Sequence, residues 1–267
     1  MLLAIDVGNT ETKLGVFESA QGELRHMWRV TTEARRTADE YGVFLTQLFA
    51  TQKLKTDAVD AVVIASVVPR LDQTILDACT RFVGAKTAFL KPHLQTLMPV
   101  LTDRPSEVGA DLVAMAIGAR KLYGAPLIVI SFGTATAFVA LSPEGAYLGT
   151  AIAPGIAISV DALIGRAAKL PQIALEAPAR AIGRDTIASL QSGIVYGFVG
   201  QTEAIVERMA AEMGGNPLVV ATGGLSDVVA KQTRRIAHVN PHLSLLGLQL
   251  FYNAGKAPGG GAAGVVE

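Results

Sequence analysis

Residues 2–17 read LLAIDVGNTETKLGVF: an apolar run, a short polar turn and a second apolar run. Two apolar runs joined by a turn that contains Gly8-Asn9 predict a β-hairpin. Glycine lets the backbone approach an anion closely, so the N–H groups and hydroxyls of this turn can bind phosphate, and Asp6 can hold a hydrated Mg²⁺ beside it. Taken alone, the motif is explained equally well by an ordinary hairpin turn.

The same pattern returns in the second half of the chain. Residues 127–141 read LIVISFGTATAFVAL, again two apolar runs around a glycine turn. Asp6 and Gly8 align with Ser131 and Gly133, about half a chain length further on. A unit that occurs twice at this separation indicates an internal duplication, and therefore two similar domains.

Composition restricts the class of protein. The chain has 267 residues, of which 50% are hydrophobic and 17% charged, enough to bury one large or two modest cores without disulfides. Lys+Arg and Asp+Glu each number 23, which argues against a nucleic-acid surface and against electrostatic membrane docking. Neither a membrane-spanning run nor a signal peptide is recognisable. We therefore expect a cytoplasmic protein with a small-molecule partner.

Apolar periodicity predicts the order of the helices and strands. In the first half we expect strands near 2–7, 12–17, 24–30, 61–66 and 86–90, and helices around 41–49, 70–83 and 107–123. In the second half we expect strands near 127–131, 134–141, 145–153, 217–221 and 236–239, a helix after Pro154-Gly155, and a long helix near 186–213. Gly193, Gly197 and Gly200 on the long helix indicate close helix approach, within the fold or across a dimer.

The predicted order is βββαβαβα, repeated, as in the actin-like ATPase and sugar-kinase fold. We therefore expect an α/β protein with two ribonuclease H-like domains that hold a nucleotide in the cleft between them. The expected domains are residues 1–123 and 124–254. A Gly/Ala-rich tail at 255–267 is expected to be flexible.

Six motifs occur in the order found in type III pantothenate kinases, and the chain resembles that family over nearly its whole length. They are DVGNTETK at 6–13, SVVP at 66–69, GAD at 109–111, FGTAT at 132–136, IAPGI at 152–156, and GRDT at 183–186 followed by QSG at 191–193. Each motif alone is weak, but six in sequence leave little room for chance.

The resemblance implies a homodimer that phosphorylates the terminal hydroxyl of pantothenate with ATP, the first committed step toward coenzyme A. It implies that Asp111 is the general base. It implies that the ATP phosphates and Mg²⁺ are held by Asp6, Val7, Gly8, Asn9, Thr10, Glu11, Thr12 and Lys13, and that Thr134 contacts the nucleotide. The positions that it places around pantothenate are Thr102, Gly109, Ala110, Asp111, Leu112 and Thr186. A monovalent cation, K⁺ or NH₄⁺, would bind at position 131.

The residues support this chemistry independently. Phosphoryl transfer depends on positioning and charge neutralisation, and one carboxylate must orient the attacking hydroxyl. Asp111 opens an amphipathic helical pattern, where the helix dipole stabilises a carboxylate. From the residues alone, a plain helix-start aspartate is the simpler interpretation.

Three positions depart from the family pattern: Leu112 replaces an arginine, Thr102 a tyrosine and Ser131 an aspartate. A guanidinium that faces a carboxylate contributes about 1.5–3 kcal/mol, so its absence weakens pantothenate capture. Three interpretations remain open. The protein is an active pantothenate kinase with altered substrate handling, a kinase of the same fold that acts on another small hydroxyl compound, or a non-catalytic ATP-binding paralogue with a regulatory role.

Overall fold

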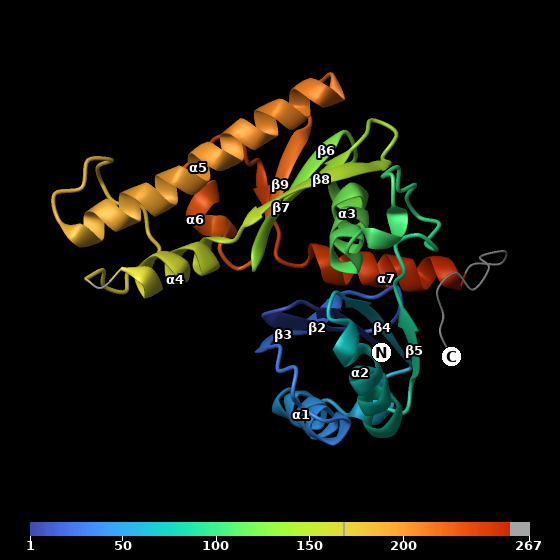
Figure 1. Cartoon of the computed structure of the whole chain (residues 1–267). Helices are drawn as coiled ribbons and strands as arrows, with labels where there is room; N and C mark the ends of the chain where they lie inside the picture. The colour runs from blue at the N-terminus through green and yellow to red at the C-terminus, as the bar shows by residue number, and fades with distance from the viewer. Residues whose placement is uncertain (168, 257–267) are drawn as a thin grey trace. The chain divides into compact units, whose positions relative to one another are not determined.

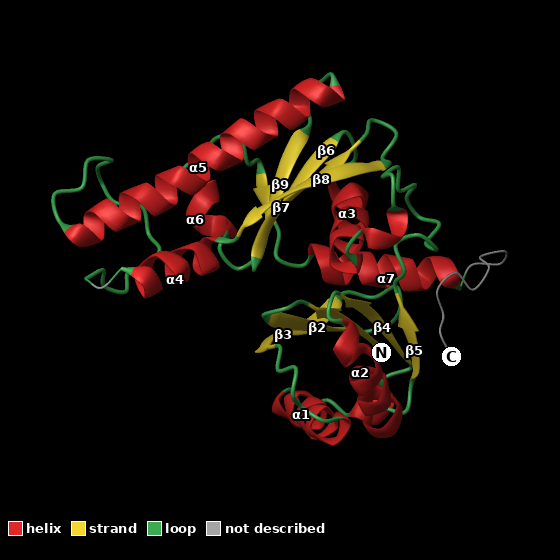
Figure 2. Cartoon of the chain, in the orientation of Figure 1, coloured by secondary structure: helices red, strands yellow, loops and turns green. Residues whose placement is uncertain are grey.

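Two five-stranded mixed sheets form the framework of the protein (Figure 1, Figure 2). The structure is a computed structural model that describes residues 1–167 and 169–256. The contacts divide the chain into two compact units. The first unit contains residues 1–121 and the segment that begins at Leu243, and the second contains Leu122–His242.

The first sheet has the strand order β3-β2-β1-β4-β5. Its strands are β1 (Leu2–Val7), β2 (Glu11–Phe17), β3 (Leu24–Thr31), β4 (Ala61–Ser66) and β5 (Lys86–Phe89). Strand β2 runs antiparallel to both β1 and β3, whereas β4 runs parallel to β1 and β5 runs parallel to β4. Every residue of β1 is buried, as expected for a strand covered on both faces.

Four α-helices belong to the first unit: α1 (Ala38–Thr51), α2 (Pro69–Phe82), α3 (Ala110–Tyr123), whose last two residues fall in the second unit, and α7 (Leu243–Gly255). Two short 3₁₀ helices also occur, η1 (Thr56–Ala58) and η2 (Pro105–Glu107). A capping box between Thr37 and Glu40 starts α1. Helices α1 and α2 share one hydrophobic core with β1, β2 and β4. Helix α7 also packs against these three strands.

Helix α3 is held by an unusually close crossing with α7. A Cβ on Gly118 of α3 would overlap the Leu243 carbonyl, and a Cβ on Gly247 of α7 would overlap the Ala114 carbonyl. Glycine at both positions lets the two backbones touch. The crossing fixes α3 against α7, which itself packs on the first sheet.

The second sheet repeats the topology of the first, with the order β10-β9-β6-β7-β8. Its elements are β6 (Leu127–Phe132), β7 (Ala135–Leu141), β8 (Tyr147–Pro154), β9 (Leu218–Thr222), β10 (His238–Val239), α4 (Ile156–Arg166), α5 (Thr186–Met213) and α6 (Ser226–Ala230). Asp6 pairs with Lys13 across the first hairpin, as Ser131 pairs with Ala137 across the second. The α/β class and the duplicated fold are as predicted.

Two details differ from the sequence-based expectation. The helix expected at 107–123 begins at Ala110, because Val108 is extended after the 3₁₀ turn Pro105–Glu107. Residues 243–254, expected in the second domain, belong to the first unit, because the helix that they form packs on the first sheet. Residues 257–267, expected to form most of a flexible tail, lie outside the described residues.

In the part of the chain that is described, no helix is long and apolar enough to span a membrane.

Candidate functional site

The turn between β1 and β2 is tightly closed and its tip faces solvent. The Gly8 N–H donates to the Glu11 carbonyl at 3.1 Å, and a Cβ on Gly8 would lie only 2.8 Å from that oxygen. Asn9 and Thr10 at the tip are exposed. The backbone at Gly8 therefore requires glycine, and the tip is accessible to a ligand.

Asp6 and Lys13 lie opposite each other at the base of this turn. They are cross-strand partners, and Lys13 Nζ is 3.9 Å from Asp6 Oδ2. Asp6 is only 7% exposed, so its charge is incompletely solvated. At 3.9 Å the ammonium and the carboxylate form an ion pair that is too long for a direct hydrogen bond.

Asp111 lies in the first turn of α3, on a tight glycine corner. Its Oδ1 accepts a hydrogen bond from the Leu112 N–H at 2.8 Å. A Cβ on Gly109 would come within 2.5 Å of the same oxygen. Gly109 therefore leaves the space that the Asp111 carboxylate occupies.

The surroundings of Asp111 shift its pKa upward. Burial and, to a smaller extent, the negative charge of Asp6 raise the pKa of Asp111 from 3.8 to about 6, although the Leu112 N–H and the charge of Lys13 act in the opposite direction. A carboxylate with a pKa near 6 can take up a proton close to neutral pH. Asp6, Lys13 and Asp111 therefore form one electrostatically coupled group in the first unit.

Thr32, directly after β3, contacts the turn from the side. Its Oγ1 donates to the Gly8 carbonyl at 2.7 Å and lies 2.8 Å from Thr12 Oγ1, and its N–H donates to the Thr10 carbonyl at 2.9 Å. Sequence analysis missed Thr32, since it carries no motif. Counting a regular antiparallel register from Phe17 would place Thr31 opposite Thr10, because the ladder has an irregularity between Val16 and Phe17 that shifts the pairing by one residue.

The remaining predicted residues are distributed over both units. Thr102 is in the first unit, and its buried Oγ1 has no hydrogen-bond partner among the residues that the structure describes. Ser131 lies in β6 between Ala137 and Thr222, and Thr134 is exposed in the β6–β7 turn. Thr186 is the exposed first residue of α5, whose amino end is capped by Asp185. Within the first unit, the structure thus brings together Asp6, Lys13, Gly109 and Asp111.

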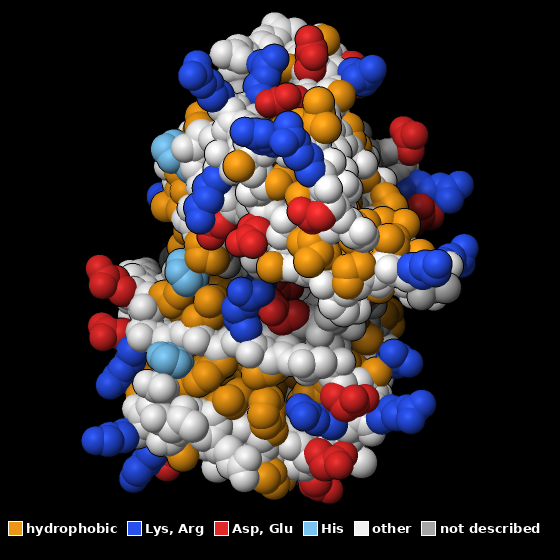
Figure 3. All heavy atoms as spheres, turned by 90° about the vertical axis from the view of Figure 1, so that its left-hand side faces the viewer, with side chains coloured by type: hydrophobic (Ala, Val, Ile, Leu, Met, Phe, Trp, Pro, Cys, Tyr) orange, Lys and Arg blue, Asp and Glu red, His pale blue; other side chains and the backbone are white. Residues whose placement is uncertain are grey.

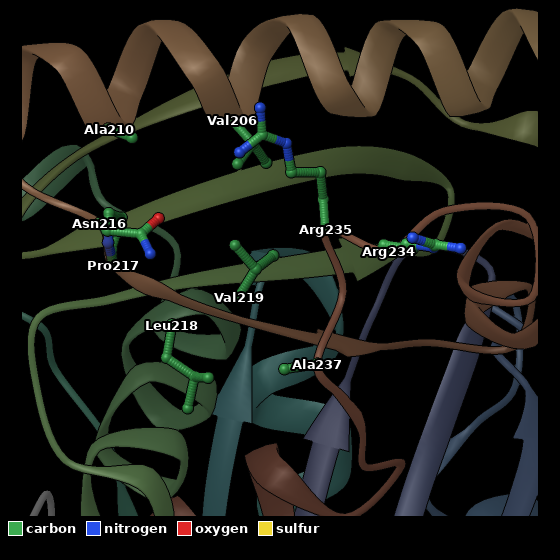
Figure 4. A pocket seen from close by; sticks show the side chains of 9 residues that line it. All are labelled: Val206, Ala210, Asn216, Pro217, Leu218, Val219, Arg234, Arg235 and Ala237. Atoms are coloured by element: carbon green, nitrogen blue, oxygen red, sulfur yellow. The ribbon is translucent and has the colours of Figure 1, made fainter.

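The second unit also contains a groove, of about 340 Å³, between α5 and the amino end of β9 (Figure 4). Arg235 extends toward α5 beside Val206, and Asn216 lies at the other end of the groove. The glycine turn at Gly223 follows the opposite end of β9, where ligands of such sheets usually bind. None of the predicted site residues lines this groove.

The family model and the similar curated proteins carry the same family name. The family model for type III pantothenate kinase matches residues 2–208. A type III pantothenate kinase of Moorella thermoacetica is 49% identical over 252 residues, which cover 94% of this chain and 98% of the relative. One from Anaeromyxobacter sp. strain K is 48% identical over 256 residues, which cover 96% and 100%.

Solved structures agree at the level of the fold. A chain from Sinorhizobium meliloti described as a 2-dehydro-3-deoxygalactonokinase superposes with a TM-score of 0.61 at 14% identity, covering 97% of this chain and 100% of that chain. The protein thus has the duplicated fold of actin-like ATPases and sugar kinases. With the family model and the two bacterial relatives, this establishes that the chain belongs to the type III pantothenate kinase family.

Proposed function

We propose that the protein transfers the γ-phosphoryl group of ATP to the terminal hydroxyl of pantothenate, the first step of coenzyme A biosynthesis, in the cytoplasm. Family membership gives the reaction. The observation that carries the proposal for this chain is Asp111, whose pKa of about 6 is produced by burial and by Asp6 at the end of the hairpin turn.

In this proposal, Asp111 accepts the proton of the attacking hydroxyl. A base is most useful when its pKa lies just below the working pH, because it is then ionised yet still binds a proton readily. The Leu112 N–H donates to one carboxylate oxygen. Because Gly109 has no side chain, the space at the amino end of α3 in which the carboxylate lies stays open. The structure therefore supports a base with a single, preorganised position.

The exposed turn at Gly8, Asn9 and Thr10 would hold the ATP phosphates through backbone N–H groups, with Glu11 and Val7 fixing its two ends. Lys13, at the base of the turn, would neutralise part of the phosphate charge. In the second unit, Thr134 is exposed in the equivalent turn and would contact the nucleotide.

Asp6 is the residue that would hold Mg²⁺. Within residues 1–167 and 169–256, no group of three or more His, Cys, Asp or Glu side chains is placed to hold a metal ion. Mg²⁺ in kinases is commonly held by one or two carboxylates, waters and the phosphates themselves, so a single buried carboxylate fits. When bound, the ion supplies charge neutralisation on the phosphates.

For pantothenate, the proposed contacts are Gly109, Ala110, Leu112, Thr102 and Thr186. The buried Thr102 Oγ1, which has no hydrogen-bond partner among the described residues, could offer a hydrogen bond to the substrate. Leu112, however, cannot pair with a carboxylate. That apolar side chain favours a second candidate function, phosphorylation of another small hydroxyl compound or a non-catalytic role in ATP binding.

We also propose that the protein is a homodimer through α4, α5 and the edge strand β8. Hydrophobic side chains reach the surface on these elements, and Figure 3 looks onto the side where α4 and α5 project. They include Ile152, Ile158, Leu163 and Ile187. A Cβ placed on Gly193, Gly197 or Gly200 of α5 would meet no described atom within 4 Å, which leaves that face free for a second helix. Sedimentation of the purified protein tests this.

A coupled ADP-release assay with pantothenate, combined with mass detection of the phosphorylated product, tests the proposed reaction. Wild type should release ADP only when pantothenate is present. Asp6→Ala should abolish phosphoryl transfer, because the metal is no longer positioned. The midpoint of thermal unfolding should stay that of the wild type. If wild type binds ATP yet releases no ADP with pantothenate, the second candidate function replaces the first.

A further inference from the structure

We propose that Thr32 is the positioning residue of the ATP-binding turn, and that the Thr12 hydroxyl serves this brace instead of contacting phosphate. The inference rests on the proposed function, because it assigns roles within the same site. Both residues lie on the flank of the turn: Thr12 is the second residue of β2, and Thr32 directly follows β3.

Thr32 makes three hydrogen bonds to the turn and its edges. Its hydroxyl bonds to the Gly8 carbonyl at 2.7 Å and to Thr12 Oγ1 at 2.8 Å. Its N–H extends the β2–β3 ladder to the Thr10 carbonyl at 2.9 Å. One residue thus holds the start, the tip and the end of the turn.

The direction of the hydroxyl bonds follows from proton counting. The Gly8 carbonyl can only accept, so the Thr32 hydroxyl must donate its single proton there. Thr12 must then donate to Thr32, because the Thr32 hydroxyl has no second proton. The chain of bonds runs from Thr12 through Thr32 to Gly8, and each bond strengthens the next.

This order decides what Thr12 can do. Its side chain is buried, with 4% of the residue exposed, and its only hydroxyl proton is committed to Thr32. A phosphate oxygen needs a donor, and the side chain of Thr12 has none left to give. Sequence analysis placed Thr12 among the phosphate-binding residues; the structure assigns it to the brace.

The second hairpin provides an internal comparison. Thr136 occupies the register position of Thr12, and Gly155 occupies that of Thr32. The Gly155 N–H donates to the Thr134 carbonyl at 3.1 Å, so the main-chain part of the brace is repeated. The hydroxyl part is not, since a Cβ on Gly155 would overlap two carbonyl oxygens of the turn.

The two hairpins therefore share a backbone brace, but only the first has a side-chain brace. The first turn is also longer by one residue: four residues separate the paired Val7 and Thr12, whereas three separate Phe132 and Thr136. A longer turn has more backbone freedom to lose when it grips a ligand. The Thr32 hydroxyl removes part of that freedom before ATP arrives.

Thr32→Val tests the brace, since valine keeps the shape of threonine but removes the hydroxyl. We expect kcat/KM for ATP to fall roughly ten- to a hundredfold, as for other small misplacements of a positioning group. Thr32→Ser, which keeps the hydroxyl, should restore most of the loss. Thr31→Val is the matched control, because Thr31 is exposed at the end of the same strand, and it should behave as wild type.

The ratio of ATP affinity to adenosine affinity separates positioning from general damage. Calorimetry should show that Thr32→Val lowers the affinity for ATP. The affinity for adenosine, which has no phosphates, should equal that of the wild type. A variant that loses both ligands equally, or that matches Thr31→Val in every measurement, would overturn the proposal.

A double-mutant cycle tests the assignment of Thr12. If Thr12 acts only through Thr32, then Thr12→Val and Thr32→Val remove the same brace, and the double variant should be no worse than the more impaired single variant. Multiplying effects would show that Thr12 contacts the phosphates directly, contrary to the proposal. Failure of the proposed function would appear separately, as wild type that does not bind ATP or does not phosphorylate pantothenate.

Discussion

The Asp111 carboxylate lies directly against the Cα of Gly109: a Cβ there would come within 2.5 Å of Asp111 Oδ1 and within 3.5 Å of Val67 Cγ1. The position of the proposed base thus depends on a residue that has no side chain. Val67 follows β4 and its N–H donates to the Val7 carbonyl, so the same corner is tied to the end of β1.

Gly109→Ala should move the carboxylate without removing it. We expect kcat for pantothenate phosphorylation to fall by roughly ten- to a hundredfold, because a displaced base loses alignment, while ATP affinity changes little. Steady-state kinetics and calorimetry check both. Gly215→Ala is the control: Gly215 is exposed and a Cβ there would meet no described atom within 4 Å. Equal kcat in both variants would contradict the steric argument.

The pKa of Asp111 predicts an acid limb in the rate. Because its pKa is about 6, kcat/KM should be constant above neutral pH and should fall about tenfold per pH unit well below 6, as the base becomes protonated. Rates from pH 5 to 8.5 in buffers of constant ionic strength measure this. Any residual activity of Asp111→Asn should lack the limb. If the variant shows the same limb, another group titrates.

The same pKa predicts a stability cost. The folded state binds the Asp111 proton more tightly than the unfolded state, so stability falls as pH rises from about 4 to 6 and stays lower above that. A shift from 3.8 to about 6 corresponds to at most about 3 kcal/mol. Asp111→Asn should therefore raise the free energy of unfolding by about 1–3 kcal/mol at pH 8, and by little at pH 4, while kcat falls ~10²–10⁴-fold.

Urea denaturation of both proteins at the two pH values, alongside kinetics at pH 8, measures this trade. A variant that is equally stabilised at pH 4 and pH 8 would show that the gain has another origin than the buried charge. A variant that is destabilised at both would show that the carboxylate makes favourable contacts which asparagine cannot replace.

Local patterns were sufficient to predict most of the fold. Strand β4 and helix α5 begin and end where apolar periodicity placed them, because both are bounded by clear polar or glycine positions. The order βββαβαβα along the first half of the chain was predicted, whereas the order of the strands within each sheet came from the structure. The placement of α7 was not predicted, since an apolar helix carries no signal for which of two sheets it covers.

The candidate site shows the same limit. Its charged residues were recognised because Asp6, Lys13 and Asp111 lie in motifs. Their coupling was not, because the pKa of Asp111 depends on burial and on Asp6, which is 105 residues away in sequence. Thr32 was missed because its role follows from strand register alone.

Leu112→Arg restores the cation of the family pattern at the residue after Asp111. We expect the KM for pantothenate to fall, by no more than the ~10–150-fold that a charge-assisted hydrogen bond supplies. The effect on kcat should be smaller, because the substrate carboxylate is remote from the reacting hydroxyl. Leu112→Met is the control, since it keeps an apolar side chain of similar volume. An unchanged KM would show that this position does not face the carboxylate.

Ser131 predicts a weak response to monovalent cations. It takes the place of an aspartate and provides one neutral oxygen in β6, where a carboxylate would provide charge. Replacing Na⁺ by K⁺ or NH₄⁺ at constant ionic strength should therefore change the rate of wild type little. Ser131→Asp should introduce a saturable activation by K⁺, with Ser131→Asn as the control that adds an oxygen without charge. A steep K⁺ dependence in wild type would show that neighbouring oxygens, for example the Thr222 side chain across the ladder, form the cation site without the carboxylate.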